Sequence, residues 1–203
     1  PVMDLSLFNI KYRIIIVLVF IAFYGNGCSD RSSTVESPDG KIKVAVEIKG
    51  SRPMYRVWYD GRQVLEPAEL GLVRNDVDFS GQMALKKVSD SKTLRRNYEM
   101  KFGKRKQRRY HANEKIYYLE HTSGKPMELI FRVSNDGFAF RYRFPDSSAT
   151  AYSIEKEQTS YRFPEGAKAW LQPLAPVNTG FAGTNPSYEE YYHQGIDVGK
   201  ESP

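Results

Sequence analysis

The chain has 203 residues, a single cysteine and a formal net charge of +6. One cysteine excludes an intrachain disulfide and any metal centre built from several thiolates. The three histidines are scattered without the spacing of metal ligands, so a zinc site is not expected.

The first 27 residues predict a secretory signal. Lys11 and Arg13 form a basic flank, and residues 14–24 are apolar throughout but too few for a membrane-spanning helix of about 20 residues. Small residues then lead directly to Cys28, an arrangement that resembles the lipobox of bacterial lipoproteins. The resemblance implies lipidation at Cys28 and an exported protein, in the periplasm or associated with the outer membrane. The alternative is an ordinary signal peptide in which Cys28 is incidental.

Residues 28–37 are small and polar, and they predict a flexible tether between the lipid anchor and the folded part. Residues 38–203 are long enough for one good-sized hydrophobic core. Loss of Lys11, Arg13 and Asp4 with the signal leaves a net charge of +5, which by itself identifies no partner.

Most of the chain after Pro38 alternates between apolar and polar residues, the pattern of half-buried β-strands. Asp60 and Gly61 separate two alternating runs and predict a tight hairpin turn. Helical periodicity is not sustained anywhere, and residues 187–193 are too few to decide. The fold class predicted is all-β, an antiparallel β-sandwich. Strands are expected over residues 41–49, 54–59, 62–65, 70–74, 83–88, 97–101, 114–122, 127–134, 138–144 and 159–163.

Residues 131–145 (FRVSNDGFAFRYRFP) predict a β-hairpin around an Asn-Asp-Gly corner, with four aromatic side chains on one face. This stretch resembles the N-terminal domain of glycoside hydrolase family 97, bacterial enzymes that act on α-linked glucosides or galactosides. Further landmarks in matching order cover nearly the whole chain after the signal. They are SPDGK at 37–41, LGL at 70–72, GKR at 103–105, residues 157–164, Trp170 and YEEY at 188–191.

The resemblance implies a sandwich of the galactose-mutarotase-like super-sandwich type, packed on a catalytic (β/α)₈ barrel that lies downstream of residue 203. The barrel would supply the general acid and the base or nucleophile, so no catalytic residue is expected in this chain. An α-glucosidase is expected ahead of an α-galactosidase. The expected partners are an oligosaccharide or polysaccharide substrate, the barrel of the same protein, and the membrane through the lipid anchor.

The resemblance also implies a calcium ion in the active site, with one glutamate contributed by the N-terminal domain. Glu189 is the expected ligand, and Glu190 is the alternative if the register differs by one. Calcium prefers hard oxygen ligands such as carboxylates. The aromatic side chains of Trp170, Tyr188 and Tyr191 would suit either a cleft that stacks sugar rings or an interface between domains.

Residues 101–109 form a dense basic run, which is expected to be a solvated loop. Binding of nucleic acid is not expected, because no nucleic-acid-binding fold accompanies the run. A stand-alone carbohydrate-binding lipoprotein without hydrolytic activity is the main alternative to a glycosidase domain. A basic surface protein that binds polyanions through residues 101–109 is a third hypothesis.

Overall fold

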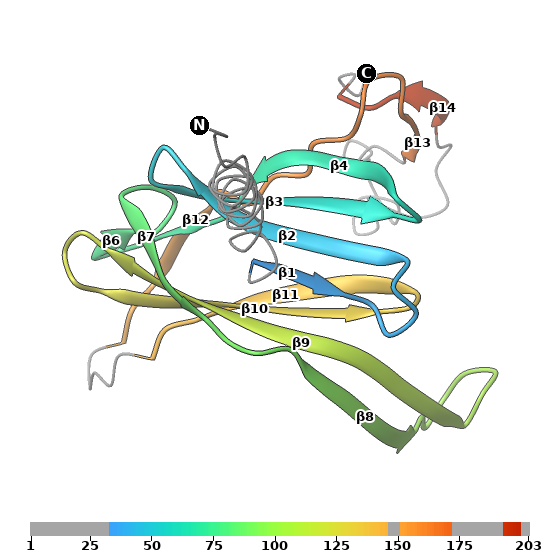
Figure 1. The fold of residues 1–203 in the computed structure, drawn as a ribbon. Coiled ribbons are helices and arrows are strands. Elements are labelled where there is room, and N and C mark those ends of the chain that lie inside the picture. The colour runs from blue at the N-terminus through green and yellow to red at the C-terminus, as the bar shows by residue number, and fades with distance from the viewer. Residues whose placement is uncertain (1–32, 146–150, 172–192, 200–203) are drawn as a thin grey trace, which may run out of the picture.

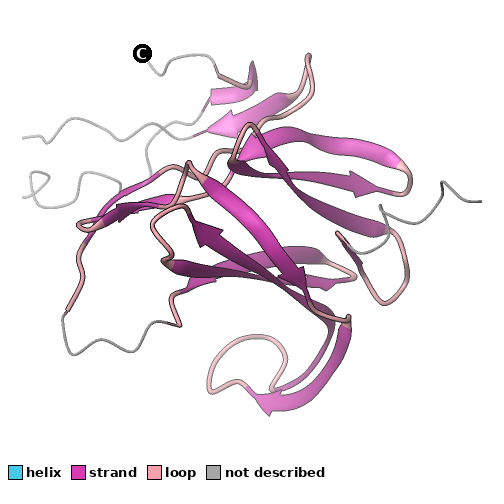
Figure 2. Cartoon of the chain, turned by 60° about the vertical axis from the view of Figure 1, so that its left-hand side comes forward, coloured by secondary structure: helices cyan, strands magenta, loops and turns pink. Residues whose placement is uncertain are grey.

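The computed structural model describes residues 33–145, 151–171 and 193–199. These residues form strands, turns and loops, and all the strand pairs among them are antiparallel (Figure 2). The described part of the chain contains no helix that could cross a membrane. The strands are β1 (Thr34–Glu36), β2 (Ile42–Lys49), β3 (Arg52–Tyr59), β4 (Arg62–Glu69), β5 (Leu72–Arg74), β6 (Val77–Asp78), β7 (Met83–Val88), β8 (Lys92–Glu99), β9 (Gln107–His121), β10 (Pro126–Ser134), β11 (Gly137–Arg143), β12 (Ile154–Glu157), β13 (Lys168–Leu171) and β14 (His193–Asp197).

Two main sheets face each other and enclose the core (Figure 1). The first has the strand order β1-β2-β3-β4, and the second has the order β11-β10-β9-β7, with β8 also paired to β9. Two small sheets, β12-β5-β6 and β13-β14, lie beyond them. The predicted antiparallel β-sandwich is confirmed.

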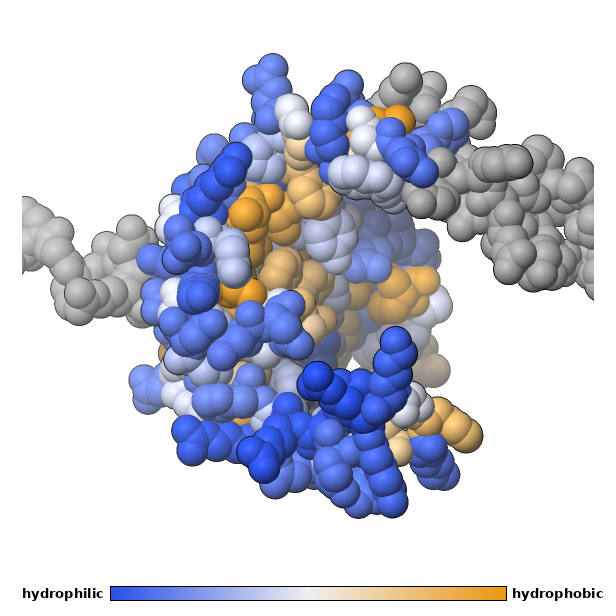
Figure 3. Space-filling model, turned by 90° about the vertical axis from the view of Figure 1, so that its right-hand side faces the viewer, coloured by the Kyte–Doolittle hydropathy of each residue, from blue (hydrophilic) through white to orange (hydrophobic). Residues whose placement is uncertain are grey.

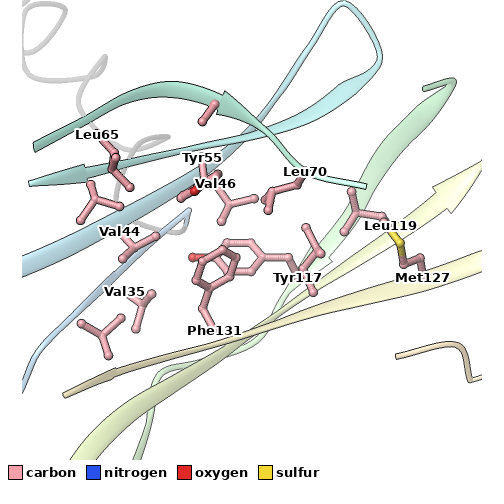
Figure 4. Packing of buried hydrophobic residues seen from close by; sticks show 14 of the residues in the cluster. Val35, Val44, Val46, Tyr55, Leu65, Leu70, Tyr117, Leu119, Met127 and Phe131 are labelled. Carbon is pink, nitrogen blue, oxygen red and sulfur yellow. The ribbon is translucent and has the colours of Figure 1, made fainter. Parts of the chain in front are cut away.

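The core consists of the side chains that the alternating pattern directs inward from both main sheets. Val44 and Val46 of β2 lie across the core from Phe131 of β10, and all three are fully buried (Figure 4). Tyr55 packs its ring against Phe131, with ring centroids 6.1 Å apart. Burial of each large apolar side chain stabilises the fold by about 1.5–3 kcal/mol, so this cluster is the main source of stability.

The short strand β1 closes one edge of the first sheet. It pairs with β2, and its Val35 is only 2% exposed. The Tyr117 hydroxyl and the Lys115 ammonium, both from β9, donate hydrogen bonds to the carbonyls of Ser33 and Thr34, each at 2.8 Å. The region predicted as a tether, residues 28–37, thus includes a short paired strand at Thr34–Glu36, which has too few residues to show an alternating pattern.

Gly71 accounts for the Leu-Gly-Leu sequence at the start of β5. Its φ of +141° lies in a region that side chains with a Cβ avoid, and an added Cβ would lie 2.5 Å from Cα of Ser80. The flanking Leu70 and Leu72 are both buried in the core. This motif therefore anchors the chain where it leaves the first sheet.

Several predicted strand limits differ from the structure, and the differences at residues 159–163 and 114–122 bear on the candidate site and on the basic run. Residues 159–163 make only one isolated bridge, Glu66 with Arg162, while the strand in this region is β12. Strand β9 begins at Gln107 rather than at residue 114, so the basic run is a loop only up to residue 106. Exposed polar side chains on both faces of these segments hide the alternation on which the prediction depends.

Candidate functional site

The segment that follows the sandwich carries most of the exposed apolar surface. We define the C-terminal strip as residues 154–171 and 193–199. It contains six of the ten exposed large hydrophobic side chains in the described part of the chain: Ile154, Tyr161, Phe163, Trp170, Leu171 and Val198. Exposed hydrophobic side chains of this size are available to a binding site or an interface.

Two tyrosines, the buried Tyr55 and the partly buried Tyr142, hold the strip against the sandwich. The Tyr55 hydroxyl donates to the carbonyl of Ser160 at 2.9 Å, and the Tyr142 hydroxyl lies 2.6 Å from Oγ1 of Thr159. Tyr142 also accepts a hydrogen bond from the backbone N–H of Gly71 at 2.8 Å. Burial raises the pKa of both phenols above the ordinary value, so both hydroxyls remain protonated and able to donate.

A hollow of about 400 Å³ lies between β11 and the strip. Among the described strands β11 pairs only with β10, so its outer edge faces this hollow. Figure 3 views this side of the molecule and shows apolar surface gathered in the middle of the face. The size suits a small ligand or the side chains of a partner. The lining residues are Phe138, Ala139, Phe140, Arg141, Tyr142, Glu157 and Tyr161.

The hairpin β13–β14 forms the end of the strip. An ion pair between Lys168 and Asp197 joins its two strands, and the Val198 N–H donates to the Ala167 carbonyl at 3.1 Å. Trp170 stands on β13 with 63% of its surface exposed. A large aromatic side chain held at such exposure is available to stack on a sugar ring or to enter a protein interface.

Arg74 contacts residues on both sides of the connection between the sandwich and the strip. It is 3% exposed and makes two hydrogen bonds to Asp76, at 2.5 and 2.9 Å. Its guanidinium also lies over the rings of Phe144 at 4.8 Å and Tyr152 at 3.8 Å. These hydrogen bonds hold the pKa of the Asp76 carboxyl below its usual value. Residues on both sides of the segment 146–150 are thus anchored to one buried cation.

Comparison with protein families decides what this sandwich is. The model of the glycosyl-hydrolase 97 N-terminal domain matches residues 35–200. The chain belongs to this family. The family resemblance drawn from the sequence motifs is therefore confirmed.

Curated relatives of this N-terminal domain are much longer proteins. A probable retaining alpha-galactosidase of Streptomyces bingchenggensis is 31% identical over 111 residues, which cover 55% of this chain and 17% of that protein. A retaining alpha-galactosidase of Bacteroides thetaiotaomicron is 27% identical over 141 residues, covering 70% of this chain and 20% of that protein. The chain thus spans about a fifth of the length of these relatives or less.

Solved structures give the same assignment. A beta-arabinopyranosidase superposes with a TM-score of 0.72 and 35% identity, covering 79% of this chain and 26% of that one. A glycoside hydrolase family 97 enzyme from Pseudoalteromonas sp. strain K8, in complex with acarbose, superposes with a TM-score of 0.63 and 25% identity. That match covers 69% of this chain and 22% of the enzyme.

Of the site residues predicted for this family 97 domain, the structure describes Trp170 alone. The predicted calcium ligand Glu189, its alternative Glu190, and the cleft residues Tyr188 and Tyr191 lie outside the described residues, as does Cys28. Sequence reasoning did not identify the Tyr55 and Tyr142 hydrogen bonds, because they join residues far apart in the chain and leave no local pattern.

The described residues do not by themselves form a calcium site. No group of three or more His, Cys, Asp or Glu side chains among them is placed to hold a metal ion. Near Trp170, the carboxylate of Asp197 is engaged by Lys168.

Proposed function

We propose that this chain is the N-terminal part of a calcium-dependent, retaining glycoside hydrolase that cleaves α-galactosidic bonds. The observation that carries the proposal is the C-terminal strip, which exposes six large apolar side chains. The domain accounts for only about a fifth of the length of its curated relatives, so most of such a protein lies outside it. A catalytic barrel downstream would pack on this strip. Domain interfaces bury apolar surface that would otherwise face water.

The relatives favour a galactose-type substrate over the α-glucoside expected first. Both curated relatives are described as retaining alpha-galactosidases, and the similar solved structure is a beta-arabinopyranosidase. A pyranose ring of L-arabinose has the hydroxyl configuration of D-galactose without the hydroxymethyl group, so one pocket shape can serve both. An α-glucoside is the second candidate, because the family 97 relative at 25% identity binds acarbose.

In this proposal the chain contributes positioning rather than proton transfer. Retaining hydrolysis needs two carboxyl groups about 5–5.5 Å apart, and the barrel would provide both. The Tyr55 and Tyr142 hydrogen bonds would hold the strip, and with it Trp170, in a fixed position relative to the sandwich. Trp170, Tyr188 and Tyr191 would line the side of the substrate cleft that this domain forms.

Glu189 would lend a carboxylate oxygen to the calcium ion, with Glu190 as the alternative ligand. Calcium bound there would polarise the substrate and orient it. Cys28 would carry the lipid that holds the exported enzyme at a membrane, in the periplasm or at the outer membrane. Anchoring near a surface would place the enzyme where oligosaccharides are taken up.

The test is an assay of the whole protein, encoded by the complete reading frame, on p-nitrophenyl α-galactoside and p-nitrophenyl α-glucoside. We expect release from the galactoside that stops on addition of a calcium chelator and returns with calcium. Binding of galactose oligosaccharides without hydrolysis of either substrate would instead support the stand-alone carbohydrate-binding lipoprotein.

The variant Glu189→Gln tests the calcium ligand. We expect it to lower calcium affinity by at least roughly 10- to 100-fold, the range for loss of a group that only supports a metal ligand. Glu165→Gln is the matched control, because Glu165 is an exposed glutamate on the strip for which the structure shows no ion pair. Equal calcium dependence in the two variants would rule Glu189 out, and Glu190→Gln would then be measured in the same way.

A further inference from the structure

The hairpin formed by β8 and the first part of β9 projects from the sandwich as a two-stranded ribbon (Figure 1). We call residues 92–111 the basic arm. Strand β10 pairs with β9 only as far as Ala112, so beyond that residue the ribbon has no third strand. Every residue from 95 to 109 is exposed to solvent.

The basic arm holds the positive charge of the protein. It contains nine lysines and arginines but only one acidic residue, Glu99, which gives a formal charge of +8. The whole chain carries +6, so the rest of the sequence is slightly acidic, at −2. Charge this concentrated, on a ribbon that contributes little to the core, points to an anionic partner.

Most of these cations are left without a carboxylate. In the described part of the chain, the one ion pair on the arm joins Lys106 to Glu99 at 3.6 Å. A hollow of about 340 Å³ on the arm is lined by three arginines together with polar and aromatic groups: Arg95, Arg96, Asn97, Arg109, Tyr110 and His111. Arginine guanidinium groups bind phosphate oxygens through paired hydrogen bonds.

The turn of the arm combines this charge with exposed apolar groups. Phe102 is 85% exposed, more than any other large hydrophobic side chain in the described residues, and Met100 is 42% exposed. Lys101, Lys104 and Arg105 lie beside Phe102 in the same turn. In Figure 3 the lower part of the face, where the arm lies, is hydrophilic with a small apolar group. Lysines and arginines around an exposed apolar side chain are typical of segments that bind membrane interfaces.

We propose that the basic arm docks on an anionic phospholipid surface. Phe102 enters the headgroup region, the cations of the turn bind the anionic surface, and Arg95 and Arg109 hold lipid phosphates in the hollow. A soluble polyanion would match the charge but gives no role to the exposed phenylalanine at the tip. The contact is independent of lipidation at Cys28 and of catalysis, and it would add a second attachment to a single lipid anchor.

The experiment measures binding of the whole protein carrying Cys28→Ser, so that no acyl chain contributes. Vesicles of phosphatidylcholine with 30% phosphatidylglycerol, roughly an ordinary anionic fraction, are compared with vesicles of pure phosphatidylcholine by co-sedimentation. We expect binding to the anionic vesicles only, weakened by high salt because the attraction is screened.

Two variants locate the contact. Each cation near an anionic bilayer strengthens binding about fivefold, so Lys101, Lys104, Arg105 and Lys106 all changed to Gln should weaken binding more than about a hundredfold. Phe102→Ser tests the apolar tip and should weaken binding about tenfold. The control removes four other exposed cations for which the structure shows no ion pair, with Lys41, Lys49, Arg62 and Lys156 changed to Gln, and should retain most of the binding.

Two results would overturn the proposal. The first is that the protein does not bind phosphatidylglycerol vesicles; retention on polygalacturonate in that case would assign the arm to a soluble polyanion. The second is that the turn variant and the control variant bind equally well.

Discussion

The sandwich and the C-terminal strip use apolar side chains in opposite ways. In the sandwich, strands β2, β3, β9 and β10 direct their apolar residues into a common core, with large residues such as Phe131 and Leu129 fully buried. In the strip, Tyr161, Phe163 and Trp170 are exposed although the backbone around them is hydrogen-bonded. The difference separates side chains that stabilise this domain from side chains that are available to another part of the protein.

The largest expected effect on the free energy of unfolding comes from a substitution in the buried core of the sandwich. Phe131→Ala removes a ring that contacts Tyr55, Tyr117 and Phe140, and it should lower the free energy of unfolding by about 3–5 kcal/mol. Trp170→Ala is the counterpart on the strip and should change it by about 0.5 kcal/mol or less. Urea unfolding of both variants measures the contrast, and equal losses would contradict the division between the two regions.

A backbone substitution should have the next largest effect. Gly71→Ala places a Cβ against Ser80 at a φ of +141°, and the strain should lower the free energy of unfolding by about 2–3 kcal/mol. Gly81→Ala is the matched control, because a Cβ at Gly81 meets no atom within 4 Å. Thermal unfolding of both variants should show a clear drop in Tm for Gly71→Ala only. A similar Tm for the two would exclude the close approach to Ser80.

The smallest expected effect on stability comes from removing a hydrogen bond that joins the strip to the sandwich. Tyr55→Phe removes the hydrogen bond to the Ser160 carbonyl and should cost about 1 kcal/mol. Amide hydrogen exchange should become faster in the strip around Ser160 and Arg162, while the core of β10 stays protected. Tyr161→Phe is the control, because Tyr161 is half exposed and the structure shows no hydrogen bond from its hydroxyl. Unchanged exchange in Tyr55→Phe would show that this tyrosine does not hold the strip.

The sequence predicts the sandwich well where burial imposes a period. Strand β7 has the predicted limits, and β2 and β10 each differ from prediction by one residue, because one face of each meets the core. The missed strands β1, β6, β12, β13 and β14 have two to five residues each, too few for a period of two to stand out. Most of these strands form because they pair with residues distant in the sequence, and the local sequence pattern does not reveal that pairing.

The candidate site was less accessible to sequence reasoning. Trp170 could be selected because it matched a family landmark, and the structure places it on an exposed hairpin. Tyr55 and Tyr142 look in the sequence like ordinary core aromatics, since their hydroxyl partners lie 105 and 17 residues away. The basic run at 101–109 was expected to be a solvated loop. It projects from the sandwich because β8 pairs with β9 to form a ribbon, and this pairing was not evident from the sequence.

The most direct test of the account is hydroxyl-radical footprinting of the whole protein, which reports the solvent exposure of individual aromatic side chains. If the strip packs on the catalytic barrel, Tyr161 and Phe163 should react slowly. Tyr59 on the sandwich and Tyr98 on the arm, which are similarly exposed in this domain, should react quickly. Rapid modification of all four side chains would contradict the account, because it would show that the strip remains open to solvent in the complete enzyme.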